Sequence, residues 1–324
     1  LKSKLDKNWK CLIYLKFVGY KYMNKVVFSQ PWGGLGDNLS FSNLPALYYE
    51  LGIKFYLSAI NNCRNTAIKE ICWDNNQYVK KPQRLIPNIG YKVMLKNNFH
   101  LSDKKFNIIQ NINCLHGFKP GNGLPEINLK YFKEPSSIKF DLMLDLNASS
   151  LFSETKSSYN NESLSEALKD YQSGNALDII YPNLYTNKIP LSKNSNFEIN
   201  SIHQLIDVLK QTNIFVCFNS GSHVLASAVK ELTGLPNKII SFNSVDDENL
   251  SIKNGKIEEK FGSYYFDNVE YIKIKTENIQ SSDEFKNNID NHASKTDYYK
   301  KLHALFFNPV ETFSSFLINK LFKK

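Results

Sequence analysis

The chain has 324 residues, of which 42% are hydrophobic and 13% aromatic, with a formal net charge of +9. This length favours two domains over a single hydrophobic core, and the composition excludes a wholly disordered protein. Only Arg64 and Arg84 are arginine, so lysine supplies nearly all the basic charge. Proteins that read nucleic acid rely on arginine forks, so we expect no nucleic-acid partner. The charge suits anionic lipid headgroups or phosphorylated substrates, or it simply reflects a lysine-rich composition.

The five cysteines are scattered and include no C-x2-C pair. An odd number without paired spacing argues against a disulfide framework and against a cysteine zinc site. No apolar stretch reaches the ~18 residues of a transmembrane helix. Lysines interrupt the apolar part of the basic, aromatic leader at residues 1–24, which argues against a signal peptide. We therefore expect a cytoplasmic protein, either free or peripheral at the inner face of the membrane.

The first half of the chain reads as a β-α-β unit. Residues 25–29 predict a buried strand, and a glycine-rich turn follows at 30–38. Residues 39–51 predict one helix with an apolar stripe, and residues 53–60 predict a second strand. A strand, helix, strand order of this kind predicts a parallel sheet.

A second α/β half begins with a predicted strand at 140–146. Further strands are predicted at 178–181, 214–218 and 238–242, and helices at 201–210 and 224–232. We therefore predict two α/β domains, over residues 25–134 and 135–276. The tail at 277–324 has helical character and is expected to pack back on the body, with a membrane surface as the alternative.

The glycine-rich turn after the first strand is the first candidate site. Ligands of open α/β sheets bind at the carboxyl ends of strands, and glycines let the backbone approach them closely. The spacing matches neither the dinucleotide fingerprint nor a P-loop. Asp37 is either an N-cap or a carboxylate that takes a proton from an acceptor hydroxyl, and the glycines favour the second interpretation. The other residues assigned to this acceptor-side loop are Gly33, Gly34, Gly36 and Asn38.

The turn before the helix at 224–232 is the second candidate site. Small side chains and amides at a helix N-terminus bind a diphosphate. The serines either contact that ligand or cap the helix, and the histidine either helps a phosphate to leave or is a satisfied residue of the first turn. No partner for a hydrolase triad lies within sequence reach of the serines. The residues assigned to donor binding are Asn219, Ser220, Gly221, Ser222 and His223.

His116 is the last candidate site residue. His116 lies in the Gly/Pro-rich segment 114–125, a predicted loop near the domain junction, where it either faces the cleft and contacts substrate or is structural. No H-E-x-x-H motif occurs, and the acidic residues 246–248 read as a solvated loop. We therefore predict no cofactor and no bound metal.

The two turns together resemble bacterial GT-B glycosyltransferases related to the lipopolysaccharide heptosyltransferase family, glycosyltransferase family nine. Gly36-Asp37 followed by Leu44-Pro45-Ala46-Leu47 is similar to that family's Gly-Asp turn and Leu-Pro-x-Leu helix. The segment from Asn219 to Leu225 is similar to its Asp-Thr-Gly-x-x-His-Leu segment. The spacing departs from the family pattern in both motifs, and Asn219 stands where the family has Asp. The resemblance is therefore to a divergent member.

The resemblance implies a GT-B fold, in which two Rossmann-like α/β/α domains face a central cleft. It implies a nucleotide-sugar donor held at Gly221 and its neighbours, with Asp37 as the acceptor-side base and no metal. The expected reaction is an inverting hexosyl or heptosyl transfer to an oligosaccharide or lipid-linked acceptor of a lipooligosaccharide, lipopolysaccharide or capsule. Two alternatives stay open: a nucleotide-sugar epimerase of the same shape, and a non-catalytic nucleotide- or glycan-binding protein.

Overall fold

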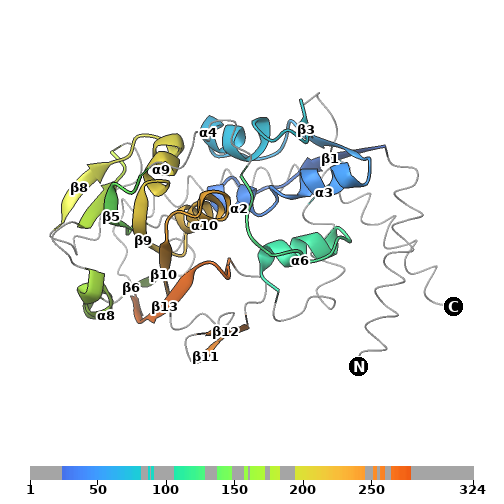
Figure 1. The fold of residues 1–324 in the computed structure, drawn as a ribbon. Coiled ribbons are helices and arrows are strands. Elements are labelled where there is room, and N and C mark those ends of the chain that lie inside the picture. Colours follow the sequence, from blue (N-terminus) through green and yellow to red (C-terminus); the bar gives the residue numbers. More distant parts are fainter. Residues whose placement is uncertain are drawn as a thin grey trace.

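A computed structural model describes the protein at residues 24–81, 87, 89–90, 106–127, 137–147, 157–159, 161–171, 176–182, 194–244, 251–253, 256–259 and 264–278. These residues form two lobes, each built on its own parallel sheet (Figure 1). The N-terminal lobe comprises the described residues up to 127, and the C-terminal lobe those from 137 onward. Nearly all of the predicted leader and tail lies outside the described residues, so their predictions stay predictions, as do the domain boundaries.

The N-terminal sheet has the strand order β3-β2-β1-β4, with every pair parallel. Val26 and Phe28 of the first strand are fully buried, as expected for a parallel strand covered on both faces. The chain runs outward through the second and third strands and then returns to the other edge of the first, which places a switch point there. The strands are β1 (Lys25–Ser29), β2 (Lys54–Leu57), β3 (Val79–Lys80) and β4 (Ile89–Gly90).

The single helix predicted at 39–51 is wrong, because two short helices, α2 (Leu35–Leu39) and α3 (Leu44–Glu50), take its place. Pro45 explains the break. In a continuous helix its ring would clash with the carbonyl of Phe41, and its missing N–H would remove a hydrogen bond. Pro45 lies in the first turn of α3, where a backbone N–H would have no hydrogen-bond partner within the helix, so proline is tolerated there. The chain therefore breaks after α2 and restarts at α3.

The remaining helices of the N-terminal lobe surround an aromatic core. Trp73 stacks on Phe55 with ring centroids 6.2 Å apart, and Phe28 lies 5.7 Å from the same indole. The segment predicted as a loop at 114–125 begins inside the last turn of a helix and is irregular after it. The helices are α4 (Thr66–Lys69), the π-helical η1 (Glu70–Asp74) and α6 (Ile108–Leu115).

The C-terminal sheet has the order β13-β10-β9-β5-β7-β8, again with every pair parallel. This is the doubly wound order, in which ligands bind where the winding reverses, here between β5 and β9. The four strands predicted in this half are confirmed, and two more join them at the edges. The strands are β5 (Phe140–Asp145), β7 (Ala176–Ile180), β8 (Ser195–Glu198), β9 (Thr212–Phe218), β10 (Lys238–Ser244) and β13 (Glu270–Ile274).

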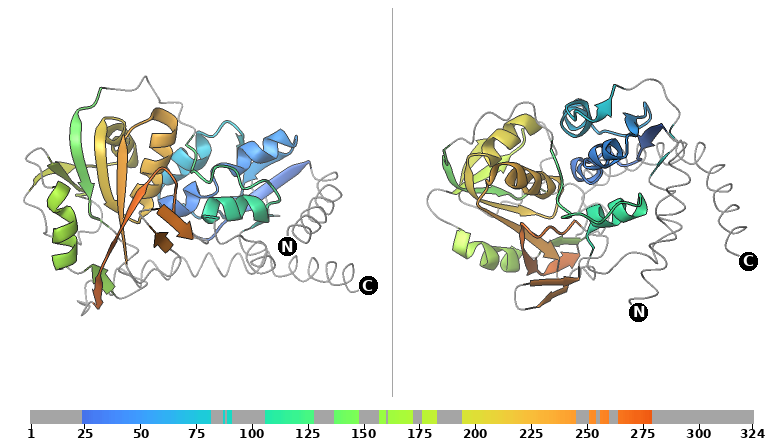
Figure 2. Two further views of the ribbon diagram at one scale, coloured as in Figure 1. Left: turned by 60° about the horizontal axis from the view of Figure 1, so that its bottom comes forward. Right: turned by 45° about the vertical axis from the view of Figure 1, so that its right-hand side comes forward.

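Helices cover both faces of this sheet. Met143 and Cys217 share a cluster with residues of α9 and α10, whereas Leu144 and Val216 pack with α8 on the opposite face. Figure 2 shows this layering on either side of the sheet. The helices are α8 (Asn161–Leu168), the 3-10 turn η3 (Lys169–Tyr171), α9 (Ile202–Leu209) and α10 (Gly221–Thr233). Two small antiparallel pairs join β6 (Ser157–Tyr159) to β14 (Thr276–Asn278) and β11 (Ser251–Lys253) to β12 (Lys256–Glu259).

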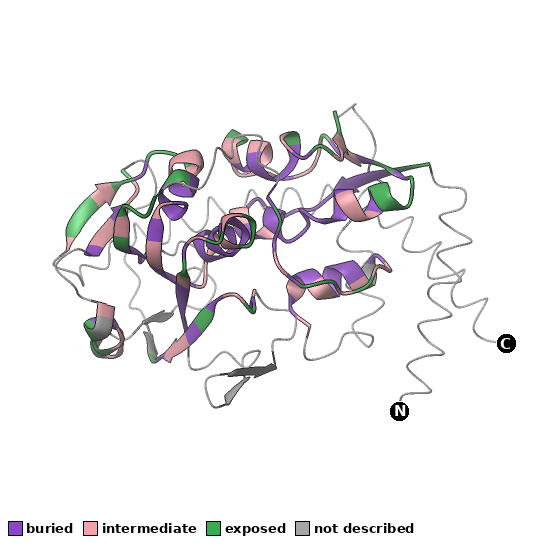
Figure 3. Cartoon of the chain, in the orientation of Figure 1, coloured by how far each residue is buried: buried purple, intermediate pink, exposed green. Residues whose placement is uncertain are grey.

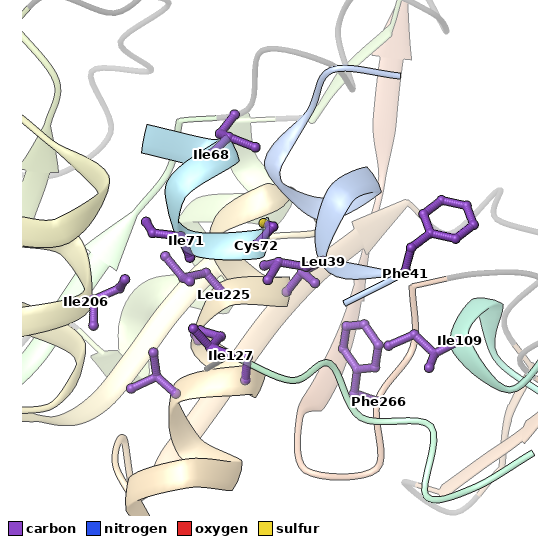
Figure 4. Packing of buried hydrophobic residues seen from close by; sticks show 14 of the residues in the cluster. Leu39, Phe41, Ile68, Ile71, Cys72, Ile109, Ile127, Ile206, Leu225 and Phe266 are labelled. Atoms are coloured by element: carbon purple, nitrogen blue, oxygen red, sulfur yellow. The ribbon is translucent and has the colours of Figure 1, made fainter. Parts of the chain in front are cut away.

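The two lobes share one hydrophobic cluster. Leu39 and Ile71 of the N-terminal lobe belong to the same cluster as Ile206 and Leu225 of the C-terminal lobe (Figure 4). Helix α10 is buried along most of its length at the centre of the molecule (Figure 3). The predicted α/β class with two Rossmann-like parallel sheets is thus confirmed. None of the helices in the described ranges combines the length and apolarity needed to cross a bilayer.

Candidate functional site

The carboxylate of Asp37 lies at the start of α2, where the two lobes meet. Its Oδ2 accepts a hydrogen bond from the N–H of Gly34 at 3.2 Å, and its Oδ1 accepts one from the hydroxyl of Tyr264 at 2.8 Å. Gly34 occupies the N-cap, so the interpretation of Asp37 as the N-cap is wrong. Asp37 instead closes the turn from the N3 position, as the acidic residue of a capping box does. Contacts from both lobes therefore fix this carboxylate.

Close packing within the protein explains why two positions of the first turn are glycine. A Cβ on Gly33 would lie 3.0 Å from Oδ1 of Asn62, and a Cβ on Gly36 would lie 3.2 Å from Cγ2 of Val224. The second contact crosses to α10, where a Cβ on Gly221 would in turn lie 3.4 Å from the backbone nitrogen of Gly36. Glycine at positions 36 and 221 lets the starts of α2 and α10 touch.

Asn38 is a structural residue of this turn. Its side chain is fully buried, and its Oδ1 accepts hydrogen bonds from Nε2 of Gln30 at 3.0 Å and from Nε1 of Trp73 at 2.8 Å. Its Nδ2 donates to the carbonyl oxygen of Gly34 at 2.9 Å. Through these inward contacts Asn38 fixes the shape of the loop that carries Asp37, and its assignment to ligand binding stays a prediction.

His116 also belongs to the core rather than to a cleft. Its ring is 2% exposed, its Nδ1 lies 2.7 Å from the hydroxyl of Tyr48, and the ring of Phe28 packs 6.4 Å away. The structure favours the structural interpretation of His116, and its contact with substrate stays a prediction. The Gly/Pro-rich sequence around it suggested an exposed junction, but the residue ends α6, whose apolar face packs into the N-terminal lobe.

The second turn leads into α10 without a side-chain cap. Ser220 is the N-cap, yet its hydroxyl lies 2.8 Å from that of Ser222 instead of bonding an amide of the helix. The backbone N–H of Asn219 donates to the carbonyl of Phe242 at 3.2 Å, which fastens the turn to the sheet. The first-turn amides of α10 thus lack a side-chain cap, and the helix dipole favours an anion beside them.

His223 holds the backbone around this turn. It is fully buried, with Nδ1 and Nε2 each 2.9 Å from a backbone carbonyl oxygen, those of Ser220 and Tyr264 respectively. Burial lowers the pKa of His223 to about 4, and the two carbonyl contacts only partly oppose this. The ring is therefore neutral near pH 7 and carries no charge for a phosphate. Its one N–H can then donate to only one of the two carbonyl oxygens. The structure favours the interpretation of a buried histidine of the first helical turn.

Asp145 was not found from the sequence. It ends β5 at the switch point, and its Oδ2 accepts a hydrogen bond from the hydroxyl of Tyr181 at 2.9 Å. The amide of Asn147 donates to Oδ1 at 3.0 Å, and the hydroxyl of Ser222 is a further partner. Burial raises the pKa of the Asp145 carboxyl, and these hydrogen bonds oppose the rise. The network ties the carboxyl end of β5 to the first turn of α10.

Neither Asp145 nor Tyr264 has a local signal that could have revealed it. Asp145 is one of two aspartates in an apolar strand, and only the strand order places it at the switch point. Tyr264 is 227 residues away from Asp37 along the chain. Within the described ranges, no group of three or more His, Cys, Asp or Glu side chains is arranged to hold a metal ion.

Comparison with known proteins finds similarity only among solved structures. No protein-family model matches the chain, and no curated protein matches it. The glycosyltransferase TibC of enterotoxigenic E. coli, described as iron-containing and dodecameric, is 16% identical with a TM-score of 0.48. The match covers 68% of this chain but only 58% of TibC. The chain thus matches less than two thirds of TibC.

Two further solved structures align over more of the chain. A family 9 glycosyl transferase from Veillonella parvula is 10% identical over 89% of this chain and 98% of its own, with a TM-score of 0.45. The E. coli ADP-heptose lipopolysaccharide heptosyltransferase II is 10% identical over 86% of this chain and 100% of its own, with a TM-score of 0.41.

Proposed function

We propose that this chain is a glycosyltransferase of the GT-B type, which transfers a sugar from a nucleotide donor to a bacterial surface glycan. One observation supports this most: a carboxylate of one lobe and an uncapped helix N-terminus of the other lie together, where Gly36 meets Gly221. The hydrogen bond from Tyr264 to Asp37 joins the same two lobes. A base beside an anion site is what transfer from a sugar diphosphate requires.

The donor diphosphate would bind at the first turn of α10. The amides of Gly221 and Ser222 and the positive end of the helix dipole would stabilise the negative charge that develops on the leaving phosphate. The residues assigned from the sequence, Asn219 to His223, are retained in this proposal, with His223 acting through the backbone that it holds. The metal independence inferred from the sequence remains part of the proposal.

Asp37 would act on the acceptor. As the acceptor oxygen attacks the anomeric carbon, the bond from that carbon to the donor phosphate breaks and the acceptor proton moves to the Asp37 carboxylate. The nucleoside diphosphate leaves with the bonding electron pair, and attack opposite the leaving group inverts the anomeric centre. The acceptor would be an oligosaccharide or a lipid-linked glycan of a lipooligosaccharide, lipopolysaccharide or capsule, reached from the cytoplasm.

Nucleotide binding tests the donor site. A ligand that binds only the folded protein raises its stability by about 2.7 kcal/mol at one hundred times its Kd. We expect one of ADP, UDP, GDP or CMP, and the matching nucleotide sugar, to raise the Tm of the full chain. The same sugars are then incubated with and without a glycan acceptor. Turnover without acceptor would instead indicate an epimerase, and a Tm unmoved by every nucleotide would contradict the donor site.

Gly34→Ala tests the acceptor side. The new methyl carbon would lie 2.5 Å from Oδ2 of Asp37, so the carboxylate has to move, while the φ of −67° at Gly34 suits alanine. We expect a folded protein whose kcat falls about a hundredfold, because a reacting group is displaced. Steady-state kinetics with circular dichroism measure both. In an Asp37→Asn background the same substitution should cost no further activity, and an additive loss would show that Gly34 acts elsewhere.

A further inference from the structure

Tyr264 reaches from the C-terminal lobe to the candidate base. Its hydroxyl donates to Oδ1 of Asp37 at 2.8 Å, and its Cε1 would lie 3.8 Å from a Cβ placed on Gly36. The tyrosine is half-buried. Its hydroxyl is therefore located at the contact between α2 and the C-terminal lobe, beside the group that the proposed reaction needs as a base.

The backbone around Tyr264 is fixed to both lobes. Its carbonyl oxygen lies 2.9 Å from Nε2 of His223, in the first turn of α10. The next carbonyl, of Tyr265, accepts a hydrogen bond at 2.9 Å from Nδ2 of Asn107, the buried N-cap of α6 in the N-terminal lobe. The N–H of Phe266 donates to the hydroxyl of Tyr271 at 2.8 Å. The segment 264–266 thus has a defined position relative to both Asp37 and the start of α10.

The hydroxyl of Tyr264 and the N–H of Gly34 bind different oxygens of Asp37. Donors at both oxygens restrict rotation of the carboxylate, and hydrogen bonds to a charged carboxylate favour its ionised form. Asp37 itself is only partly buried, so these bonds orient its carboxylate without enclosing it.

We propose that Tyr264 is a positioning residue through which the donor-binding lobe sets the orientation and the ionisation of Asp37. This inference rests on the proposed function, because it assigns Tyr264 a role in the same reaction. The phenol itself undergoes no chemical change and transfers no proton. Its contribution is a hydrogen bond that exists only when the segment held by His223 lies against α2. The orientation of the Asp37 carboxylate then depends on the same turn of α10 that would hold the donor diphosphate.

Tyr264→Phe removes the hydroxyl and keeps the ring. We expect kcat to fall about tenfold with KM for donor and acceptor unchanged, since a hydrogen bond to a charged group is lost. Because a hydrogen bond to the carboxylate favours its ionised form, we also expect the acidic limb of the kcat profile to move to higher pH in this variant. Tyr49→Phe, at an exposed position of α3, is the matched control and should change neither quantity.

A pH titration of the carbon-13 resonances of the aspartate carboxyls in the full chain tests the hydrogen bond between Tyr264 and Asp37 without requiring turnover. The Asp37 resonance, assigned by its absence from Asp37→Asn, should titrate at higher pH in Tyr264→Phe than in the wild type or in Tyr49→Phe. An unmoved resonance, or a raised kcat, would overturn the positioning role. A wild-type protein that transfers no sugar, yet shows the shifted titration, would overturn the proposed function while leaving the contact established.

Discussion

Asp37→Asn is expected to lower kcat about a thousandfold, within the range that general base catalysis contributes. An amide has no basic oxygen that could take the acceptor proton, so the attacking hydroxyl would have to lose its proton to water. Nucleotide binding should persist, because the proposed diphosphate site lies on α10 and not on Asp37. The measurements are kcat with a nucleotide sugar and its acceptor, and Kd for the nucleotide by thermal shift.

Asparagine can keep the hydrogen bonds to Gly34 and Tyr264. Its amide oxygen can accept from the N–H of Gly34, and its NH2 group can donate to the Tyr264 hydroxyl oxygen, which accepts as readily as it donates. Loss of activity would therefore not reflect loss of these two hydrogen bonds. Asp141→Asn, at an exposed position of β5, is the matched control and should keep full activity. A folded Asp37→Asn variant with wild-type turnover would show that another group is the base.

Asn38→Ala is expected to lower the free energy of unfolding by about 3 to 5 kcal/mol. The substitution leaves two buried donors, Nε2 of Gln30 and Nε1 of Trp73, without the Oδ1 atom that accepts from both. Each unsatisfied buried donor costs about 1–3 kcal/mol, and the vacated space adds to the loss. Activity should fall as well, because Asn38 shapes the loop that carries Asp37.

Urea denaturation followed by tryptophan fluorescence measures this loss, since Trp73 reports directly on the affected core. Asn200→Ala, at an exposed position before α9, is the control and should change the midpoint little. If Asn38→Ala unfolds at the wild-type urea concentration, the buried hydrogen bonds of Asn38 do not stabilise the N-terminal lobe.

Sequence patterns identified much of the sheet framework because parallel strands are buried on both faces. Residues 25–29 and 214–218 stand out as short apolar runs next to turn residues, and both lie in central strands of their sheets. Local rules also place turns rich in glycine and serine directly after these strands. They failed at 39–51, where an apolar stripe predicted one helix and the backbone chemistry of Pro45 divided it into two.

The roles of the individual side chains depended on contacts between distant parts of the chain. His116 and Asn38 are polar residues in glycine-rich surroundings, which locally suggests exposure, yet both are buried by elements far away in sequence. Tyr264 and Asp145 acquire partners only when strands and lobes are assembled. No periodicity records such contacts, because hydrogen bonds across lobes depend on position in space rather than on spacing in sequence.

By itself, the sequence determined two α/β halves, the two turns at the ends of their central strands, and Asp37 as the carboxylate to test. Periodicity and turn chemistry are local, so they can be read without the fold. Only the tertiary structure decided that Gly36 and Gly221 face each other and that His223 is buried and neutral. It also decided that Tyr264 holds Asp37. These facts follow from the packing of α2 against α10, which no single segment of the chain encodes.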